Sequence, residues 1–248
     1  MPPRMGGMAT APHSPAAWPP PARDSRPLAV LVSGGLDSAI LLAEAVRSFA
    51  VVYPVYVEVG SYWERVEQVY LRRFLAAIAA PNLRPLTVLA QPIADVYGAH
   101  WSLTGDGVPG SDSADDAVFL PGRNVLLLAK PLLWCHLNRV PAIATATLAS
   151  NPFPDADDAF YDGFAGVVSR AVAGQVRVVR PYADLGLRKA DVLRRGVGLP
   201  LEHTFSCIDP AGDSHCGRCN KCGERRLGFR DAGLPDPTTY AARSTIDA

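Results

Sequence analysis

Residues 28–38 read Leu-Ala-Val-Leu-Val-Ser-Gly-Gly-Leu-Asp-Ser, an apolar run followed by a glycine-rich polar loop. The run 28–32 predicts a buried strand, and residues 38–50 repeat apolar side chains at helical spacing. Glycines at a strand-to-helix junction let the backbone approach a phosphate closely, and the amide groups of the helix N-terminus attract its charge. No Gly-Lys-Ser or Gly-Lys-Thr follows, so the loop is not a Walker motif. We therefore predict a pyrophosphate-binding loop, with a plain structural turn as the alternative.

The loop resembles that of the N-type ATP pyrophosphatases, which cleave ATP between its α- and β-phosphates and leave AMP on an acceptor. The resemblance implies adenylation and not phosphoryl transfer. Ser33 and Ser38 would donate hydroxyl groups to phosphate oxygens, and Asp37 would be the partner of Mg²⁺ or a carboxylate beside the phosphates. The expected ATP-binding residues are Ser33, Gly34, Gly35, Leu36, Asp37 and Ser38.

Short apolar runs alternate with helical patterns along most of the chain. Strands are expected at 28–32, 51–57, 86–89, 142–147 and 176–179, and helices at 38–50, 62–80, 124–138, 155–172 and 187–197. Pro54 is expected to mark a bulge or the end of its strand. The alternation predicts an α/β fold with a doubly wound, mostly parallel five-stranded sheet. Loops 33–38, 59–64 and 147–155 would then converge beyond the carboxyl ends of the strands, where such sheets bind ligands.

Composition divides the chain into three parts. Residues 1–26 are rich in Pro and Ala and are expected to form a disordered tail. Residues 27–200 would form the nucleotide-binding domain, and residues 201–248 a metal-binding segment with a C-terminal helix. The long Gly-, Ser- and Asp-rich connection 91–121 is expected to be a lid or a disordered segment.

Charge and hydropathy restrict the partners of the chain. The 248 residues include 24 basic and 24 acidic side chains, so the net charge is zero and nucleic acid is not a favoured partner. No apolar run reaches the length of about 18 residues that a membrane span needs. The beginning of the chain lacks an export signal, so a cytoplasmic location is expected.

Four of the five cysteines cluster near the C-terminus, as Cys207, Cys216, Cys219 and Cys222. Four thiolates close a tetrahedral shell around Zn²⁺, and the two-residue spacings let tight turns point successive sulfurs at one ion. An iron–sulfur cluster remains an alternative that spacing does not exclude. A complete shell leaves no open position, so the metal is expected to be structural. Cys135 stands alone on an apolar helix face and is expected in the core.

The pyrophosphatase loop together with this cysteine array resembles the 7-cyano-7-deazaguanine synthase family of queuosine biosynthesis. The segments 119–124 (Phe-Leu-Pro-Gly-Arg-Asn) and 152–155 (Pro-Phe-Pro-Asp) look like family motifs, and Lys189 matches the lysine of a third. His203-Thr204 and residues 228–238 also agree, so the resemblance extends with gaps over residues 28–240.

The resemblance implies a ligase that uses ATP and ammonia to convert the carboxylate of 7-carboxy-7-deazaguanine into a nitrile, releasing AMP and pyrophosphate. Asp37, Lys189 and Arg123 would be catalytic, with the two cations binding negative charge. Asn124 and Asp155 would contact the deazaguanine substrate, although Asp155, Asp157 and Asp158 are equally suited to capping a helix. ATP, Mg²⁺ and Zn²⁺ are the implied cofactors, and a homodimer is a further expectation from the family.

Two segments depart from the family pattern. Residues 59–64 (Val-Gly-Ser-Tyr-Trp-Glu) lack the family's histidine, and residues 147–151 (Thr-Leu-Ala-Ser-Asn) lack its acidic and aromatic stretch. A related pyrophosphatase that modifies another acid, a protein or tRNA is therefore an alternative. A non-catalytic nucleotide-sensing or zinc-knuckle module is another, and Arg218, Lys221, Arg225 and Arg226 could give it an RNA-binding face or only a solvated one. Trp63 could stack on a purine or fill the core, and His100 and Trp101 could be lid contacts or incidental loop residues.

Overall fold

A five-stranded parallel sheet forms the centre of the molecule, which the computed structural model describes from residue 18 to residue 241. The strand order is β3-β2-β1-β4-β5, and every neighbouring pair of strands is parallel. The strands are β1 (Asp24–Leu31), β2 (Phe49–Glu58), β3 (Thr87–Ala90), β4 (Ala142–Ala144) and β5 (Arg177–Val179). This architecture confirms the α/β fold expected from the alternating pattern.

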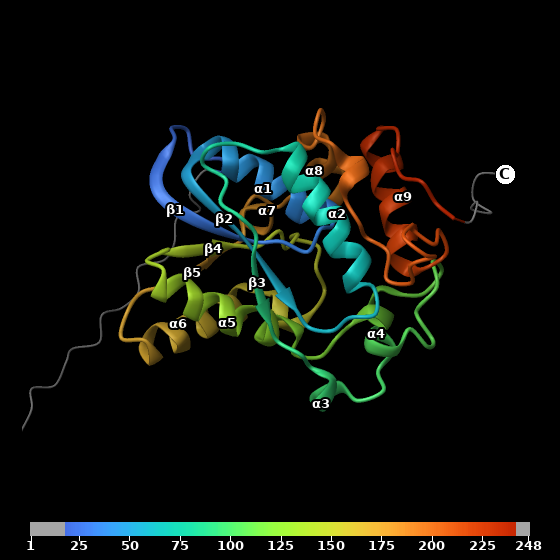
Figure 1. Cartoon of the computed structure of the whole chain (residues 1–248), viewed down its shortest axis with the longest axis horizontal. Helices are drawn as coiled ribbons and strands as arrows, with labels where there is room; N and C mark the ends of the chain where they lie inside the picture. Colours follow the sequence, from blue (N-terminus) through green and yellow to red (C-terminus); the bar gives the residue numbers. More distant parts are fainter. Residues whose placement is uncertain (1–17, 242–248) are drawn as a thin grey trace, which may run out of the picture.

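Helices cover both faces of the sheet (Figure 1). One face carries α1 (Leu36–Ser48), α2 (Glu64–Ala77), α7 (Pro181–Asp184) and α8 (Lys189–Arg195), and the other carries α5 (Arg123–Leu137) and α6 (Asp158–Ala171). Because side chains alternate along a strand, Leu28 and Val30 join the core under α1, whereas Ala29 joins the core under α5 and α6. The sheet is therefore buried on both faces, as its continuous apolar strands require.

The remaining elements lie beside the carboxyl ends of the strands. They are α3 (Ala94–Tyr97), α4 (Trp101–Thr104), α9 (Asn220–Ala232) and the 3₁₀ turns Asp115–Val118, Pro154–Ala156 and Leu201–His203. Figure 1 shows α9 at one end of the molecule and the start of β1 at the other, with α3 and α4 below α9 in this view. The expected C-terminal helix is thus confirmed.

Three expectations differ from the structure. The disordered tail was expected to extend through residue 26, and its predicted end is wrong, because β1 begins at Asp24 and the Trp18 indole donates to Glu44 at 2.8 Å. Residues 1–17 of the predicted tail lie outside the described part of the chain. Pro54 neither ends β2 nor shifts its register, since it pairs with Val30 in the middle of the β1–β2 ladder. The helix expected at 155–172 begins only at Asp158, because Asp157 caps it by accepting from the backbone N–H of Phe160.

The connection 91–121, expected to be a lid or a disordered segment, is ordered, so the second of these alternatives is wrong. It contains α3, α4 and a 3₁₀ turn, and it pairs with the cysteine segment through the backbone bridge Gly110–Cys219. Within residues 18–241 no helix is long and apolar enough to cross a membrane.

Candidate active site

A cavity of about 350 Å³ opens at the carboxyl edge of the sheet, where the connections from β1 and β4 diverge. The residues that line it come from the loops after β1, β2 and β4, from the start of α5, from α8 and from the C-terminal segment. The three loops that were expected to converge at this edge do so. Ser33, Ser61 and Thr147 each represent one of them in the wall of the cavity.

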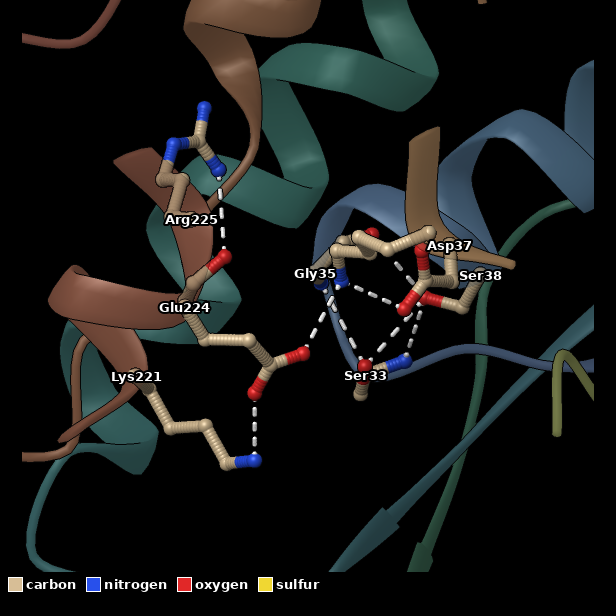
Figure 2. A network of polar contacts seen from close by, with 9 residues as sticks. Ser33, Gly35, Asp37, Ser38, Lys221, Glu224 and Arg225 are labelled. Atoms are coloured by element: carbon tan, nitrogen blue, oxygen red, sulfur yellow. Dashed lines mark hydrogen bonds and ion pairs between the residues drawn. The ribbon is translucent and has the colours of Figure 1, made fainter. Parts of the chain in front are cut away.

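The glycine-rich loop is held in shape by its own two serines. The Ser33 backbone N–H donates to Ser38 Oγ at 3.2 Å, the two hydroxyl oxygens lie 3.2 Å apart, and the Gly35 N–H reaches Ser33 Oγ at 3.3 Å. Figure 2 shows this small network at the start of α1. The N-terminal amide groups of a 13-residue helix therefore face the cavity without a side-chain cap. Such a helix end is a site for an anion.

Gly34 explains why the loop needs glycine. Its φ of +75° lies in the left-handed region, and a Cβ there would meet the Glu67 backbone oxygen at 3.1 Å. Its carbonyl oxygen accepts from the Phe205 N–H at 2.8 Å. The glycine-rich loop is thus in close contact with α2 on one side and is hydrogen-bonded on the other to the segment that carries the cysteines.

Four charged side chains that line the cavity are connected by a continuous series of ion pairs. Lys189 Nζ lies 2.7 Å from Asp37 Oδ2 and 3.4 Å from Glu224 Oε1, while Lys221 Nζ lies 2.6 Å from Glu224 Oε2. Figure 2 shows Glu224 and Lys221, from α9, directed toward the loop that contains Asp37. The sequence assigned Lys189 and Asp37 to one site, and the structure brings them together across 152 positions of the chain.

Electrostatics keeps Lys189 and Glu224 charged although both are buried. Burial acts against the charge of Lys189, but Asp37 and Glu224 outweigh it and hold the pKa of Lys189 above its usual value. Burial likewise opposes the charge of Glu224, and the two lysines overcome this and lower its pKa to about 2. Lys189 is therefore an ammonium group and Glu224 a carboxylate at neutral pH.

One oxygen of the Asp37 carboxylate is left without a hydrogen-bond partner in the described part of the chain. Within residues 18–241, its Oδ1 is the one buried side-chain oxygen or nitrogen that has no hydrogen-bond partner. Buried polar atoms normally have a partner, so an orphaned carboxylate oxygen beside the glycine-rich loop points to a ligand. A hard cation that bridges to phosphate, as Mg²⁺ does, fits this oxygen.

The segment 119–124 places a cation and an amide in the wall of the cavity. Arg123 begins α5, is exposed, and makes no ion pair with any residue of the described part of the chain. Asn124 and Asp155 hold each other: Asp155 Oδ2 accepts from the Asn124 N–H at 2.9 Å, and Asn124 Nδ2 donates to the Asp155 carbonyl at 2.7 Å. Both residues line the cavity, and Asp155 also fixes the N-terminus of α5.

Two acidic residues of α2 in the cavity wall were missed from the sequence. Glu64 closes the divergent loop 59–64 by accepting from the N–H groups of Val59 and Gly60 at 2.8 and 2.9 Å. Glu67 accepts from the Tyr56 hydroxyl at 2.6 Å, and burial raises the pKa of Glu67 to about 8. The pattern that could have indicated both is a pair of acidic residues spaced by three on an otherwise apolar helix face.

The four C-terminal cysteines form a compact, buried cluster. Their sulfur atoms all lie within 4.8 Å of one another, with 3.7 Å between Cys207 and Cys219 and 4.0 Å between Cys216 and Cys222. Sulfurs bound at about 2.3 Å to one tetrahedral ion are separated by about 3.8 Å. Backbone N–H groups, such as that of Cys219 to Cys216 Sγ at 3.3 Å, also point at the sulfurs, as thiolates require. The cluster could bind a metal ion.

The basic residues beside the cluster do not form an exposed face. Arg225 is 1% exposed and donates to Thr238, Ser206 and the Leu201 carbonyl. Arg226 lies over the Tyr240 ring and donates to the Gly217 carbonyl, and Lys221 faces the cavity. The possible RNA-binding face made of all four residues is therefore wrong, because tertiary packing buries one of them and turns another inward.

The structure also shows where the remaining residues singled out in the sequence lie. Cys135 is fully buried in the core, as expected, and burial raises the pKa of its thiol to about 12. Trp63 is buried and stacks on Trp101, and both residues also line the cavity, so stacking of Trp63 on a purine and a lid contact of Trp101 stay predictions. Asp158 lies at the surface and pairs with Arg180.

The sequence matches one protein family over most of its length. The model of the family described as "Queuosine biosynthesis protein QueC" matches residues 28–233. The 7-cyano-7-deazaguanine synthase of Methanothrix thermoacetophila is 34% identical over 225 residues, which cover 85% of this chain and 96% of that protein. The 7-cyano-7-deazaguanine synthase 1 of Mesorhizobium japonicum is 31% identical, with 85% and 92% covered.

Solved structures show more distant similarity. The U34-tRNA thiolase NcsA from Methanococcus maripaludis, solved with its [4Fe-4S] cluster, has a TM-score of 0.43 and 11% identity over 85% of this chain and 68% of that one. The extent of the family match and the identity to the two synthases decide the assignment. This chain belongs to the QueC family of queuosine biosynthesis proteins.

Proposed function

We propose that this protein is an ATP-dependent ligase that converts 7-carboxy-7-deazaguanine and ammonia into 7-cyano-7-deazaguanine, with release of AMP and pyrophosphate. One observation carries the proposal: the Ser-Gly-Gly-Leu-Asp-Ser loop lies at the mouth of the cavity with Lys189 only 2.7 Å from Asp37. This arrangement supports binding of a triphosphate and departure of pyrophosphate. The names of the two relatives supply the product, 7-cyano-7-deazaguanine, and the corresponding carboxylate is the acceptor that we propose.

The proposed reaction needs two adenylations. A carboxylate oxygen of the substrate attacks the α-phosphorus of ATP, the bond to the bridging oxygen breaks, and pyrophosphate leaves. Ammonia then adds to the acyl carbon, loses a proton and displaces AMP, which gives the amide. The amide oxygen attacks a second ATP, pyrophosphate leaves, and loss of AMP and two protons gives the nitrile. Each oxygen of the original carboxylate therefore leaves on one AMP.

The residues of the cavity divide this work. The amide groups at the start of α1 and the ammonium of Lys189 bind the phosphates and stabilise charge on the departing pyrophosphate. Arg123, in the wall of the cavity, offers a planar guanidinium that binds a carboxylate or a phosphate. Asn124 and Asp155 would orient the deazaguanine, and their mutual hydrogen bonds hold them in place.

Two metals belong to the proposal. Asp37 would hold Mg²⁺, which screens the negative charge of the triphosphate. The four cysteines would hold Zn²⁺, whose role there is to fix the C-terminal segment against the phosphate loop through the Phe205–Gly34 hydrogen bond. The cytoplasmic location and the homodimer stay predictions.

Isotope transfer tests this function directly. The metal-loaded protein is incubated with ATP, Mg²⁺, ammonium and substrate labelled with ¹⁸O in both carboxylate oxygens, and the products are weighed by mass spectrometry. We expect the nitrile together with two AMP, each of which carries one ¹⁸O. AMP without the label, or no nitrile from a protein that binds ATP, would refute the acceptor.

A matched pair of variants tests the role of the phosphate loop. Asp37→Asn should stop pyrophosphate release while the circular dichroism and the metal content stay unchanged. Asp231→Asn removes an exposed carboxylate on α9 that does not line the cavity, so it should remain active. Full activity of Asp37→Asn would remove Asp37 from the mechanism.

A further inference from the structure

The metal-binding segment contributes charged side chains to the wall of the nucleotide cavity. Lys221 is the second residue of α9 and lies between two cysteines of the cluster, Cys219 and Cys222. Glu224 lies less than one turn further along the same helix, and both side chains line the cavity. A metal held by these cysteines fixes the backbone on both sides of Lys221.

Glu224 forms ion pairs with two lysines. Its Oε1 faces Lys189 at 3.4 Å and its Oε2 faces Lys221 at 2.6 Å, so one carboxylate places both ammonium groups along the entrance. Figure 2 shows Lys221 and Glu224 opposite the loop that contains Ser33 and Gly35, and both side chains line the cavity. An ordinary surface pair spaced by three on a helix would point into solvent and contribute about 0.2–0.5 kcal/mol. This pair instead continues the Asp37–Lys189 ion pair.

The charges along the entrance explain why a second lysine is needed. With Lys189 alone, the carboxylates of Asp37 and Glu224 would outnumber the cations at a place that must accept a polyanion. Lys221 balances them, and its ammonium can leave Glu224 for a phosphate oxygen because the side chain is still about one third exposed.

We propose that Lys221 is a second phosphate-binding lysine of the ATP site, presented by the cysteine cluster and held in readiness by Glu224. This inference rests on the proposed function, since it assumes that the cavity binds ATP. Lys221 would contact the pyrophosphate portion of the nucleotide, whereas Lys189 remains beside Asp37. Integrity of the metal centre would then set the affinity for pyrophosphate.

The test is a binding measurement that needs no turnover. Isothermal titration with Mg²⁺-pyrophosphate and with Mg²⁺-ATP is carried out on the full, metal-loaded chain and on Lys221→Met. Loss of a charge-assisted contact should weaken pyrophosphate binding by about tenfold or more. Arg218→Met is the matched control: it removes one positive charge from the same segment, but Arg218 is exposed and does not line the cavity. Its affinity should stay within about twofold of the parent, because exposed charges are screened.

A double variant separates contact from simple neutralisation. If Lys221 touches phosphate, Lys221→Met should weaken binding equally in the parent and in Glu224→Gln. If Lys221 only neutralises Glu224, its effect should vanish once Glu224 is uncharged, and the inference is wrong. Equal losses for Lys221→Met and Arg218→Met would overturn it as well.

Metal content and the thermal midpoint are measured for every variant, and Lys221→Arg, which keeps the charge, should recover most of the affinity. If Lys221→Met loses its metal, Lys221→Gln replaces it in the same comparison. A parent protein that binds neither ATP nor pyrophosphate would refute the proposed function. A parent that binds both, with Lys221 variants unchanged, would refute only the role of Lys221.

Discussion

Replacing Glu44 by glutamine should destabilise the protein strongly, although Glu44 lies away from the cavity. Glu44 is on α1 and is 4% exposed. Its Oε1 accepts from Arg195 Nε at 2.6 Å, and its Oε2 accepts from Trp18 Nε1 at 2.8 Å and from the Tyr182 hydroxyl at 3.0 Å. One carboxylate thus joins the N-terminal segment, α7 and α8 to α1.

The structure sets the size of the effect. In Glu44→Gln the amide oxygen can replace Oε2 and keep Trp18 and Tyr182, but the NH₂ group then faces the N–H of Arg195. Breaking a buried ion pair in this way costs about 3–5 kcal/mol. The Arg195 side chain is 28% exposed and regains some hydration, so we expect a cost just below that range, about 2–3 kcal/mol. This corresponds to a fall of about 4–10 °C in the thermal midpoint.

Urea unfolding followed by circular dichroism measures the change. Arg47→Gln, an exposed residue on the same helix, is the control and should change the free energy of unfolding by less than about 0.5 kcal/mol. A loss below about 1 kcal/mol for Glu44→Gln would show that Arg195 is hydrated almost as well as it is paired, and would refute the reasoning. Pyrophosphate binding at low temperature should persist, because the Asp37–Lys189 contact is made at the other end of the same helix pair.

Three further perturbations have expected outcomes. Cys219→Ser should lose the metal, as elemental analysis would show, and lower the free energy of unfolding by more than about 3 kcal/mol, because metal binding is coupled to folding; a stable, metal-free variant would contradict this. Gly34→Ala should cost about 2–3 kcal/mol in urea unfolding, since a left-handed φ and the contact with α2 both oppose it, whereas Gly60→Ala, with φ +86° but open space, should cost about 1–2 kcal/mol. Glu67 has a folded pKa of about 8, above its unfolded value of about 4.3, so its stabilising effect is complete below pH 4.3 and is lost as the pH rises through 8. The parent should therefore lose at least about 1 kcal/mol more than Glu67→Gln between pH 5 and pH 8 in unfolding titrations, despite the hydrogen bond from Tyr56, and equal slopes would sink this assignment.

Local patterns predicted much of the candidate site. The apolar run 28–32 and the glycine-rich loop after it placed a phosphate-binding turn at the end of β1, because strand burial, left-handed glycine geometry and helix N-terminal amides are all short-range properties. The four cysteines were equally evident, since their short spacings bring the sulfurs together with little help from the rest of the chain.

Long-range contacts were harder to predict. The roles of Arg225 and Lys221 depend on which face of α9 packs against the domain, and α9 is polar along most of its length, so its sequence carries little signal about that face. Glu67 was overlooked for the same reason: a carboxylate on an amphipathic helix is normally solvated, and only the approach of the Gly34 loop and Tyr56 encloses it.

The sequence by itself determined the class of fold, the glycine-rich loop between β1 and α1 and the cysteine cluster, because each depends on residues that are close together in the chain. The tertiary structure decided the order of the strands, the meeting of Asp37 with Lys189 and the chain of charges through Glu224 to Lys221. The Asp37–Lys189 contact joins residues 152 positions apart, and packing of whole helices on the sheet, not local propensity, sets the distance between these side chains.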